Sequence, residues 1–407
     1  MPKMKVSFRC GILCVRNEQI NAIKSTGAGI MKNLLVGNGI NIQFNKTDYT
    51  TQQIVLRILK NCDRDDFPSH IIVNFPYLLK NYIGQLYLEA RKIILGEYDN
   101  FTFGSAEKGS LSAFKKQYSD KMNLLRITDI GFEDYYLIHD LVCHKKRVQN
   151  PEQFYIRESM KVAYLYSIFN DGKLNQLYMN YSVAFVKYLL DFDNIFTTNY
   201  DSNLESATGK EIFHIHGQFD KKSDVYVESS FRNQLPDAPI KDIEIDDAYF
   251  YLYSNALSTH CGEYKELQLK QHSQANSCVE KMALAYLSDA KIKQEVDSWT
   301  QDTNTLTANL GYAIQLKAAN PSLAFSDDYH FDKFKSIIGT IEILGLSPWN
   351  DFHIFESIDA AALEACTYYF FNESECDVIK GLLPTLSGQG KIKFKSVKEF
   401  WERYYEE

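Results

Sequence analysis

Residues 194–201 read Asn-Ile-Phe-Thr-Thr-Asn-Tyr-Asp, residues 212–217 read Ile-Phe-His-Ile-His-Gly, and these two stretches decide the fold. Each is a short apolar run that stops abruptly on polar side chains, as a buried strand does when it enters a loop. Asn199 and Asp201 end the first run, and His216 ends the second. The short spacing between them predicts two adjacent strands of one sheet whose ends meet at a pocket.

A glycine turn marks an earlier strand. The apolar residues Leu34–Val36 lead into Gly37-Asn38-Gly39-Ile40-Asn41. Nucleotide-binding α/β sheets begin in this way, because glycine lets the backbone approach a phosphate near a helix N-terminus. The turn is only part of a G-x-G-x-x-G pattern, since position 42 is Ile, so a purely structural turn is the alternative. Further strands are predicted at 340–344, 366–371 and 391–394.

Helical spacing of apolar residues fills the long segments between these strands. It predicts helices at about 50–62, 71–95, 132–146, 152–169, 174–190 and 262–290. We therefore predict an α/β fold over residues 31–407, with a Rossmann-like parallel sheet and large α-helical insertions at about 50–190 and 255–325. Residues 218–245 are polar and contain Pro236 and Pro239, so they are predicted to be a loop. Residues 1–30 hold no strong pattern and form an N-terminal extension of uncertain status, or else the natural start is Met31.

The composition fits a globular cytoplasmic protein. The 407 residues are 45% hydrophobic and 24% charged, which is ordinary for such proteins. With a net charge of −8, the chain as a whole has no excess of basic residues of the kind that a nucleic-acid binder carries. The eight cysteines include no Cys-x-x-Cys pair, which argues against a zinc ribbon, and their scatter without a signal peptide indicates reduced thiols. No stretch approaches the roughly 20 apolar residues of a membrane span.

The polar ends of the two opening strands each have a catalytic and a structural interpretation. Thr198, Asn199 and Asp201 could orient a sugar hydroxyl or a water, or Asp201 or Ser202 could cap the helix that follows. His216 suits acid–base work, because the unperturbed pKa of histidine is about 6.5. His214 and His216 share a strand face and could instead bind a metal, but they would need a third ligand.

A fourth polar segment, Gly345-Leu346-Ser347 with Asp351, follows the predicted strand at 340–344. Open α/β sheets bind ligands at loops of this kind, although a simple turn explains the same residues. All four polar segments directly follow a predicted strand. In a parallel sheet they would lie at one edge, where an amide, a carboxylate and an imidazole form a set suited to splitting a nucleotide sugar.

In this order the motifs resemble those of the sirtuin superfamily, which carries a Gly-Ala-Gly-x-Ser loop, a Thr-Gln-Asn-x-Asp strand end, a His-Gly strand end and a later Gly-Thr-Ser loop. The matching segments here are Gly37–Asn41, Thr197–Asp201, His216-Gly217 and Gly345–Ser347. The chain departs from sirtuin deacylases because it has no four-cysteine zinc module, Thr198 stands where Gln is usual, and Asn41 stands where Ser is usual. Together with the large helical block, these departures are similar to the sirtuin-like NAD hydrolases of bacterial anti-phage defence.

The resemblance implies an NAD glycohydrolase that cleaves NAD to nicotinamide and ADP-ribose in abortive infection, with NAD as substrate and without cofactor or metal. It implies catalytic roles for Asn199, His216 and Asp201. It implies NAD-binding roles for Gly37, Asn38, Gly39, Asn41, Thr198, Ser347 and Asp351, with the two glycine amides on the pyrophosphate and Ser347 and Asp351 on the adenosine half. His214 is expected to be structural or to support the site.

The resemblance also implies a homo-oligomer, gated by oligomerisation or by a partner such as a HerA-type ATPase, since the chain has no P-loop of its own. Contacts with membranes or nucleic acids are not expected. Two alternatives share the same pocket: a sirtuin-type deacylase or ADP-ribosyltransferase, and a non-enzymatic subunit that binds NAD or ADP-ribose to control assembly. A nuclease is the least supported, given the charge of −8 and no paired Asp-x-Asp motif.

Overall fold

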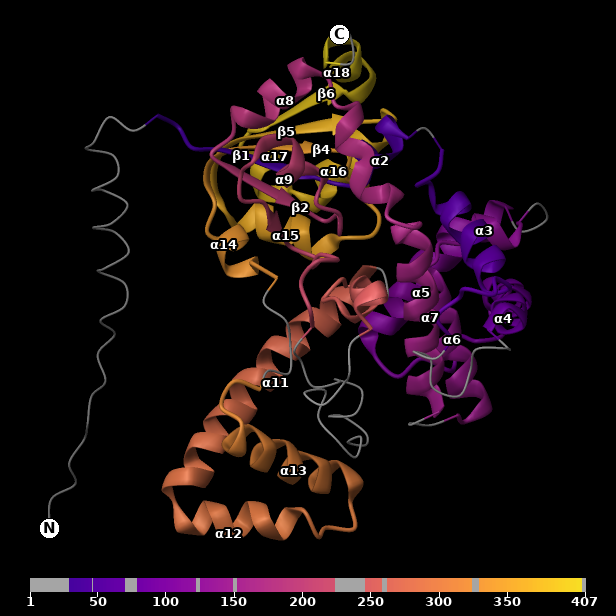
Figure 1. The fold of residues 1–407 in the computed structure, drawn as a ribbon, viewed down its shortest axis with the longest axis vertical. Helices are drawn as coiled ribbons and strands as arrows, with labels where there is room; N and C mark the ends of the chain where they lie inside the picture. Colours follow the sequence, from indigo (N-terminus) through magenta and orange to yellow (C-terminus); the bar gives the residue numbers. More distant parts are fainter. Residues whose placement is uncertain are drawn as a thin grey trace, which may run out of the picture.

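Six parallel strands form one continuous sheet (Figure 1). The computed structural model describes residues 29–45, 47–69, 79–121, 125–148, 152–223, 246–257, 262–323 and 329–404. The strand order is β3-β2-β1-β4-β5-β6, and every neighbouring pair is parallel. The strands are β1 Lys32–Val36, β2 Asn194–Thr197, β3 Phe213–His214, β4 Ile338–Leu344, β5 Ala362–Phe370 and β6 Ile392–Ser396. The predicted α/β fold with a Rossmann-like parallel sheet is confirmed.

Helices cover both faces of the sheet. Side chains alternate along a strand, so Leu34 and Val36 of β1 enter one helical layer and Leu35 enters the other. The first layer contains α2 (Gly39–Phe44), α8 (Val183–Leu190), α9 (Asn203–Thr208) and α18 (Val397–Tyr404). The second contains α14 (Phe331–Lys335), α15 (Phe352–Ala360), α16 (Ser374–Leu382) and α17 (Pro384–Gly388). Burial on both faces explains why these strands read as apolar runs.

The long segment between β1 and β2 is helical and builds a second body beside the sheet (Figure 1). It has its own apolar core, in which Tyr135, Tyr136 and Tyr164 are fully buried. Its helices are α3 (Thr51–Asn61), α4 (Leu79–Ile94), α5 (Ser105–Tyr118), α6 (Asp134–Lys146) and α7 (Glu152–Phe169), with short 3-10 turns η3 (Ser119–Lys121) and η4 (Ile127–Asp129). Residues 71–78 of the predicted helix at 71–95 lie outside the described residues.

The predicted single helix at 174–190 is wrong. The structure has a 3-10 segment, η5 (Lys173–Asn180), and then α8 as a separate helix. The break has a local cause, because the Ser182 side chain accepts a hydrogen bond from the amide of Phe185 and so caps α8. Phe185 and Leu189 of α8 then pack on the sheet.

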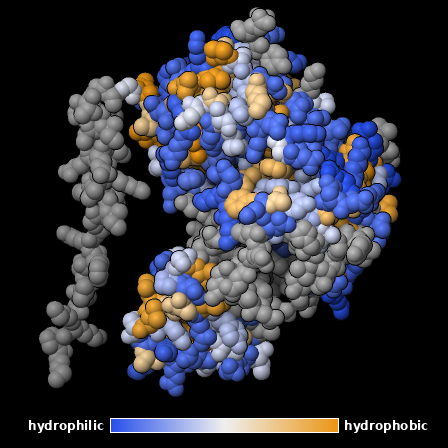
Figure 2. Space-filling model, in the orientation of Figure 1, coloured by the Kyte–Doolittle hydropathy of each residue, from blue (hydrophilic) through white to orange (hydrophobic). Residues whose placement is uncertain are grey.

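The second insertion is an arm of three helices that extends away from the sheet (Figure 1). It follows η7 (Asp247–Tyr253) and consists of α11 (Gly262–Ser288), α12 (Ala290–Trp299) and α13 (Thr305–Ala319). Hydrophobic side chains gather on the arm's surface (Figure 2), and Leu284, Leu287 and Tyr312 are exposed there. Most of the predicted loop at 218–245, with Pro236 and Pro239, and residues 1–28 lie outside the described residues. Among the described helices, none is long and apolar enough to cross a membrane.

Candidate functional site

A cavity of about 1570 Å³ opens at the carboxyl ends of the central strands. It lies where the strand order reverses, between β1 and β4, which is where open α/β sheets bind ligands. The predicted site residues line this cavity with the exception of Gly37: Asn38, Gly39, Asn41, Thr198, Asn199, Asp201, His216, Ser347 and Asp351. The opposite wall comes from the helical insertions, through residues such as Lys116 of α5 and Lys265 of α11.

The glycine turn joins two strand ends. The amide of Gly37 donates to Leu344 O (2.9 Å), and that of Gly39 donates to Gly345 O (2.8 Å). A Cβ atom on Gly37 would lie 2.4 Å from Gly345 O, and one on Gly39 would lie 2.6 Å from Gly345 Cα. These glycines therefore allow backbone contact between the ends of β1 and β4. The expectation that their two amides hold a pyrophosphate does not fit this arrangement, because both amides already have acceptors.

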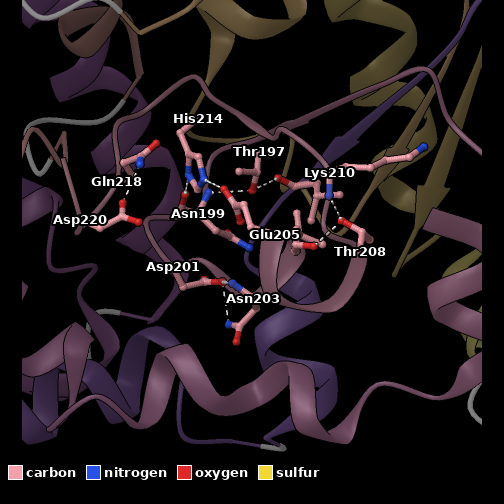
Figure 3. A network of polar contacts seen from close by, with 12 residues as sticks. Thr197, Asn199, Asp201, Asn203, Glu205, Thr208, Lys210, His214, Gln218 and Asp220 are labelled. Carbon is pink, nitrogen blue, oxygen red and sulfur yellow. Dashed lines mark hydrogen bonds and ion pairs between the residues drawn. The ribbon is translucent and has the colours of Figure 1, made fainter. Parts of the chain in front are cut away.

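Asn199 is fixed at three points, and Figure 3 shows its contacts with Thr197 and His214. Its amide donates to Thr197 Oγ1 (3.0 Å), and its Nδ2 donates to Gly37 O (3.3 Å). Its carbonyl accepts from His214 Nδ1 (2.8 Å), while His214 Nε2 contacts Glu205 Oε1 (2.6 Å). Burial lowers the pKa of His214, but the Glu205 carboxylate outweighs it and leaves this pKa raised. His214 thus supports Asn199, and it does not converge with His216 on a shared metal.

Asp201 accepts three hydrogen bonds within the protein. Its Oδ2 accepts from Asn41 Nδ2 (2.8 Å), and its Oδ1 accepts from the amide and the Nδ2 of Asn203 (3.2 and 2.6 Å). Burial raises the pKa of this carboxyl. Asp201 contacts the first amide of α9, but the N-cap of that helix is Ser202, whose side chain makes no capping hydrogen bond, so the expected side-chain cap is not formed. Within the described residues, Asn41 Oδ1 is a buried acceptor without a hydrogen-bond partner, and Asn41 lines the cavity.

His216 pairs with a histidine that the sequence reasoning missed. Its Nε2 lies 3.0 Å from His353 Nε2, and the two rings stack at 5.2 Å. His353 is in the first turn of α15, two residues after Asp351. Burial lowers the pKa of His216 well below its usual range, so this imidazole is neutral at neutral pH. The only local signal for His353 was its position just beyond the loop that contains Ser347.

A buried lysine organises the acidic side of the cavity. Lys265 Nζ lies 3.0 Å from Glu133 Oε1 and 3.3 Å from Asp351 Oδ1. Burial alone would raise the pKa of Asp351, but the Lys265 ammonium outweighs burial and holds this pKa at about 2. For Glu133 burial dominates and raises the pKa to about 7. Asp351 Oδ1 is also 3.8 Å from His216 Nε2. Asp351 therefore belongs beside His216, and the expectation that it contacts an adenosine half does not fit this position.

Three side chains have the geometry of a metal site. Within the described residues, the ligand atoms of His216, Asp351 and His353 all lie within 4.8 Å of one another. The ammonium of Lys265, however, already contacts the same carboxylate oxygen of Asp351. A divalent cation there would face this positive charge at close range, which is costly in a buried site. The group is therefore better described as a hydrogen-bonded and ion-paired cluster.

The remaining predicted residues lie at the rim of the cavity. Thr198 continues the β1–β2 ladder through its amide, which donates to Val36 O (3.0 Å). Ser347 Oγ accepts from the amide of Trp349 (3.4 Å). Trp349 and Phe371 also line the cavity and are largely exposed, so they offer aromatic surface to a ligand. No known family matches this chain, and no curated protein matches it.

Proposed function

We propose that this chain is a sirtuin-type NAD glycohydrolase, which cleaves NAD to nicotinamide and ADP-ribose. The observation that carries the proposal is that Asn199 and His216, from neighbouring strand ends, line one cavity beside the β1–β4 crevice. The cavity exceeds the roughly 300–1,000 Å³ of ordinary small-ligand pockets, so it has room for a dinucleotide. The order of the motifs along the chain is also that of sirtuins.

In this mechanism the nicotinamide–ribose bond breaks through an oxocarbenium-like state. The electron pair of that bond leaves with nicotinamide, which departs uncharged. Asn199 orients the attacking water or a ribose hydroxyl at the anomeric carbon. His216 accepts the proton of the attacking water, directly or through a ribose hydroxyl, and later releases it to solvent. A lowered pKa suits this task, because a base must be unprotonated before it acts.

Substrate positioning falls to the asparagines of the glycine turn. Asp201 accepts hydrogen bonds from Asn41 and Asn203, so its main role is to hold Asn41 in place beside the ligand. Asn41 Oδ1 then offers a free acceptor to a ribose hydroxyl or to the nicotinamide amide. Asn38 uses one hydrogen of its Nδ2 on Tyr49 O and keeps the other for the pyrophosphate, and Ser347 and Trp349 receive the adenosine half.

The test is nicotinamide release from NAD, followed by mass spectrometry. Asn199→Ala and His216→Ala should each lower the rate by about 10²–10⁴-fold. His144→Ala is a matched control, because His144 contacts Phe101 O in the helical body and does not line the cavity. Unchanged release in both site variants, with intact thermal unfolding, would contradict the assignment.

The proposed setting is abortive infection, with activity gated by a homo-oligomer or by an ATPase partner. The exposed apolar residues of the arm, Leu284, Leu287 and Tyr312, support a role in assembly. A non-enzymatic NAD- or ADP-ribose-binding subunit is the second candidate. The contact between His216 Nε2 and His353 favours it, because one nitrogen of the supposed base is occupied. NAD binding without turnover, in the isolated chain and in its assembly, would select this alternative.

A further inference from the structure

His216, which lines the cavity, and His353, which lies behind it, share one short contact. His216 comes from the end of β3 and His353 from α15, and their Nε2 atoms are 3.0 Å apart. Two imidazole nitrogens approach this closely when an N–H of one donates to the lone pair of the other, or when both bind one cation. The ammonium of Lys265, 3.3 Å from the adjacent Asp351 carboxylate, argues against the cation. A single shared proton is the remaining explanation.

The direction of this hydrogen bond decides whether His216 can act as a base. If His353 were the donor, the proton of His216 would sit on Nδ1 and the ring would have no basic nitrogen facing a ligand. If His216 Nε2 is the donor, its Nδ1 keeps a lone pair. Among the described residues, His216 Nδ1 makes no hydrogen bond, while His216 lines the cavity. The second arrangement leaves the basic nitrogen open to a substrate.

We infer that His353 accepts the Nε2 proton of His216 and is a positioning residue for the NAD-cleaving reaction. The inference rests on the proposed function and assigns a role to a residue outside the sirtuin-like motifs. His353 does not line the cavity, so it acts through His216. It fixes the His216 ring and selects the tautomer that has a free Nδ1, much as a buried partner orients a catalytic imidazole in other enzymes.

The proton balance of the step is simple. As the oxygen of the water or ribose hydroxyl bonds to the anomeric carbon, its proton moves to His216 Nδ1. The glycosidic electron pair leaves with nicotinamide. His216 is then an imidazolium whose Nε2 proton is shared with neutral His353, so the positive charge spreads over two rings. When the products leave, His216 returns one proton to solvent and the pair regains its starting state.

The charges around the pair fit this step. Asp351, 3.8 Å from His216 Nε2, stabilises a transient imidazolium. Lys265 opposes it, and Glu133 on the far side of Lys265 offsets part of that charge. Burial is the largest influence and keeps the pKa of His216 low. A neutral acceptor is therefore valuable here, because a charged His353 would add a second cation to a buried site.

The experiment compares His353→Phe, which removes the acceptor, with His353→Gln, whose side-chain carbonyl can accept the same hydrogen bond. We expect His353→Phe to lower kcat by about 10²-fold with little change in KM. The rising limb of its plot of kcat against pH should move to lower pH. The reason is that protonated His216 loses the acceptor that stabilises it, so the pKa of His216 falls. His353→Gln should recover at least tenfold of the loss and return the limb towards its native position. His144→Phe serves as the matched control.

The direction in which the kcat–pH limb moves separates a hydrogen-bond acceptor from a nearby charge or a packing residue. If His353 acted only as a nearby positive charge, its removal would move the limb to higher pH, and that result would overturn the inference. Equal losses in the Phe and Gln variants would do the same, because they would indicate a packing role. Thermal unfolding of all variants identifies any that fail to fold.

A second readout does not depend on NAD. In ¹⁵N-histidine-labelled protein, a hydrogen bond between two ring nitrogens gives a scalar coupling across it by NMR, and either His353 variant should abolish this coupling. If the coupling is absent from the native chain, the inference is wrong even when NAD is cleaved. If the coupling is present but the native chain releases no nicotinamide under any condition, the proposed function and the catalytic role of His353 both fail.

Discussion

Replacing Lys265 with Met tests how much the cluster at the cavity wall depends on one buried cation. Methionine has nearly the length of lysine and is apolar, so the packing of α11 is largely kept. What disappears is the ammonium that lies 3.0 Å from Glu133 Oε1 and 3.3 Å from Asp351 Oδ1. Both carboxylates stay buried, and neither retains the positive partner that the native chain supplies.

The magnitude follows from this burial. Removing one partner of a buried ion pair typically costs about 3–5 kcal/mol, because an uncompensated charge is left behind. With a urea dependence of roughly 3 kcal/mol per molar, the unfolding midpoint should fall by roughly 1–2 M. Tryptophan fluorescence in a urea titration measures it. Lys92→Met is the matched control: Lys92 forms a solvent-exposed pair with Glu89, and its loss should leave the midpoint almost unchanged.

The effect should depend on pH through Glu133. The folded-state pKa of this carboxyl is raised by burial to about 7 from its ordinary value of 4.5. A raised carboxyl pKa means that the contribution of this group to native stability is greatest below pH 4.5 and declines as the pH rises towards 7. Without Lys265 this pKa rises further, so the decline continues above pH 7. The gap between native and Lys265→Met should therefore be larger at pH 8 than at pH 5.

Two outcomes would refute this reasoning. One is a Lys265→Met midpoint that matches the Lys92→Met control, which would mean that the buried contacts contribute nothing net. The other is a stability gap that is the same at both pH values, which would mean that Glu133 is not the group left uncompensated. The double variant Lys265→Met with Glu133→Gln should recover part of the lost stability at pH 8, because one of the two uncompensated buried carboxylates is then removed.

Two further predictions concern the sheet edge. Gly37→Ala should destabilise the chain by about 1–3 kcal/mol, because its Cβ would lie 2.4 Å from Gly345 O. Gly84→Ala in α4 is the control: a Cβ there meets nothing within 4 Å, so this variant should be slightly more stable than the native chain. Equal effects of the two variants in urea titrations would contradict the close contact at Gly37. Glu205→Gln should lower the pKa of His214, since the native carboxylate raises it. The stability from a raised histidine pKa is lost as the pH rises through that pKa, so the melting temperatures of native and Glu205→Gln should differ more at pH 6 than at pH 9. A gap that grows with pH would count against this ion pair.

The sheet could be predicted because parallel strands buried on both faces have a strong local signature. Leu34–Val36 and Ile195-Phe196 read as apolar runs, and the polar residues after them mark the carboxyl edge. Since all parallel strands end on the same side, the residues that follow them had to converge. The position of Asn199 and His216 in one cavity follows from that rule alone.

Other features were not visible because they depend on contacts between distant segments. Glu133 and Lys265 are 132 residues apart in the chain, and neither belongs to a local motif. His353 lies on a helix whose pattern indicates only an amphipathic face. The wrong prediction of one helix at 174–190 has a different cause. Ser182 is a recognisable N-cap in the sequence, but the apolar periodicity continues on both sides of it and favoured an unbroken helix.

The contact of Gly37 and Gly39 with Gly345 divides the cavity into two parts with different freedom to change. At the glycine contact, main chain meets main chain, so no side chain can be added there without a clash. This part of the sheet edge is the same for any ligand. The facing wall consists of side chains from the helical insertions, such as Lys116 and Lys265, and these can be exchanged singly. A change of substrate preference in this scaffold would therefore be expected in the helical wall, while the glycine contact holds the sheet edge fixed.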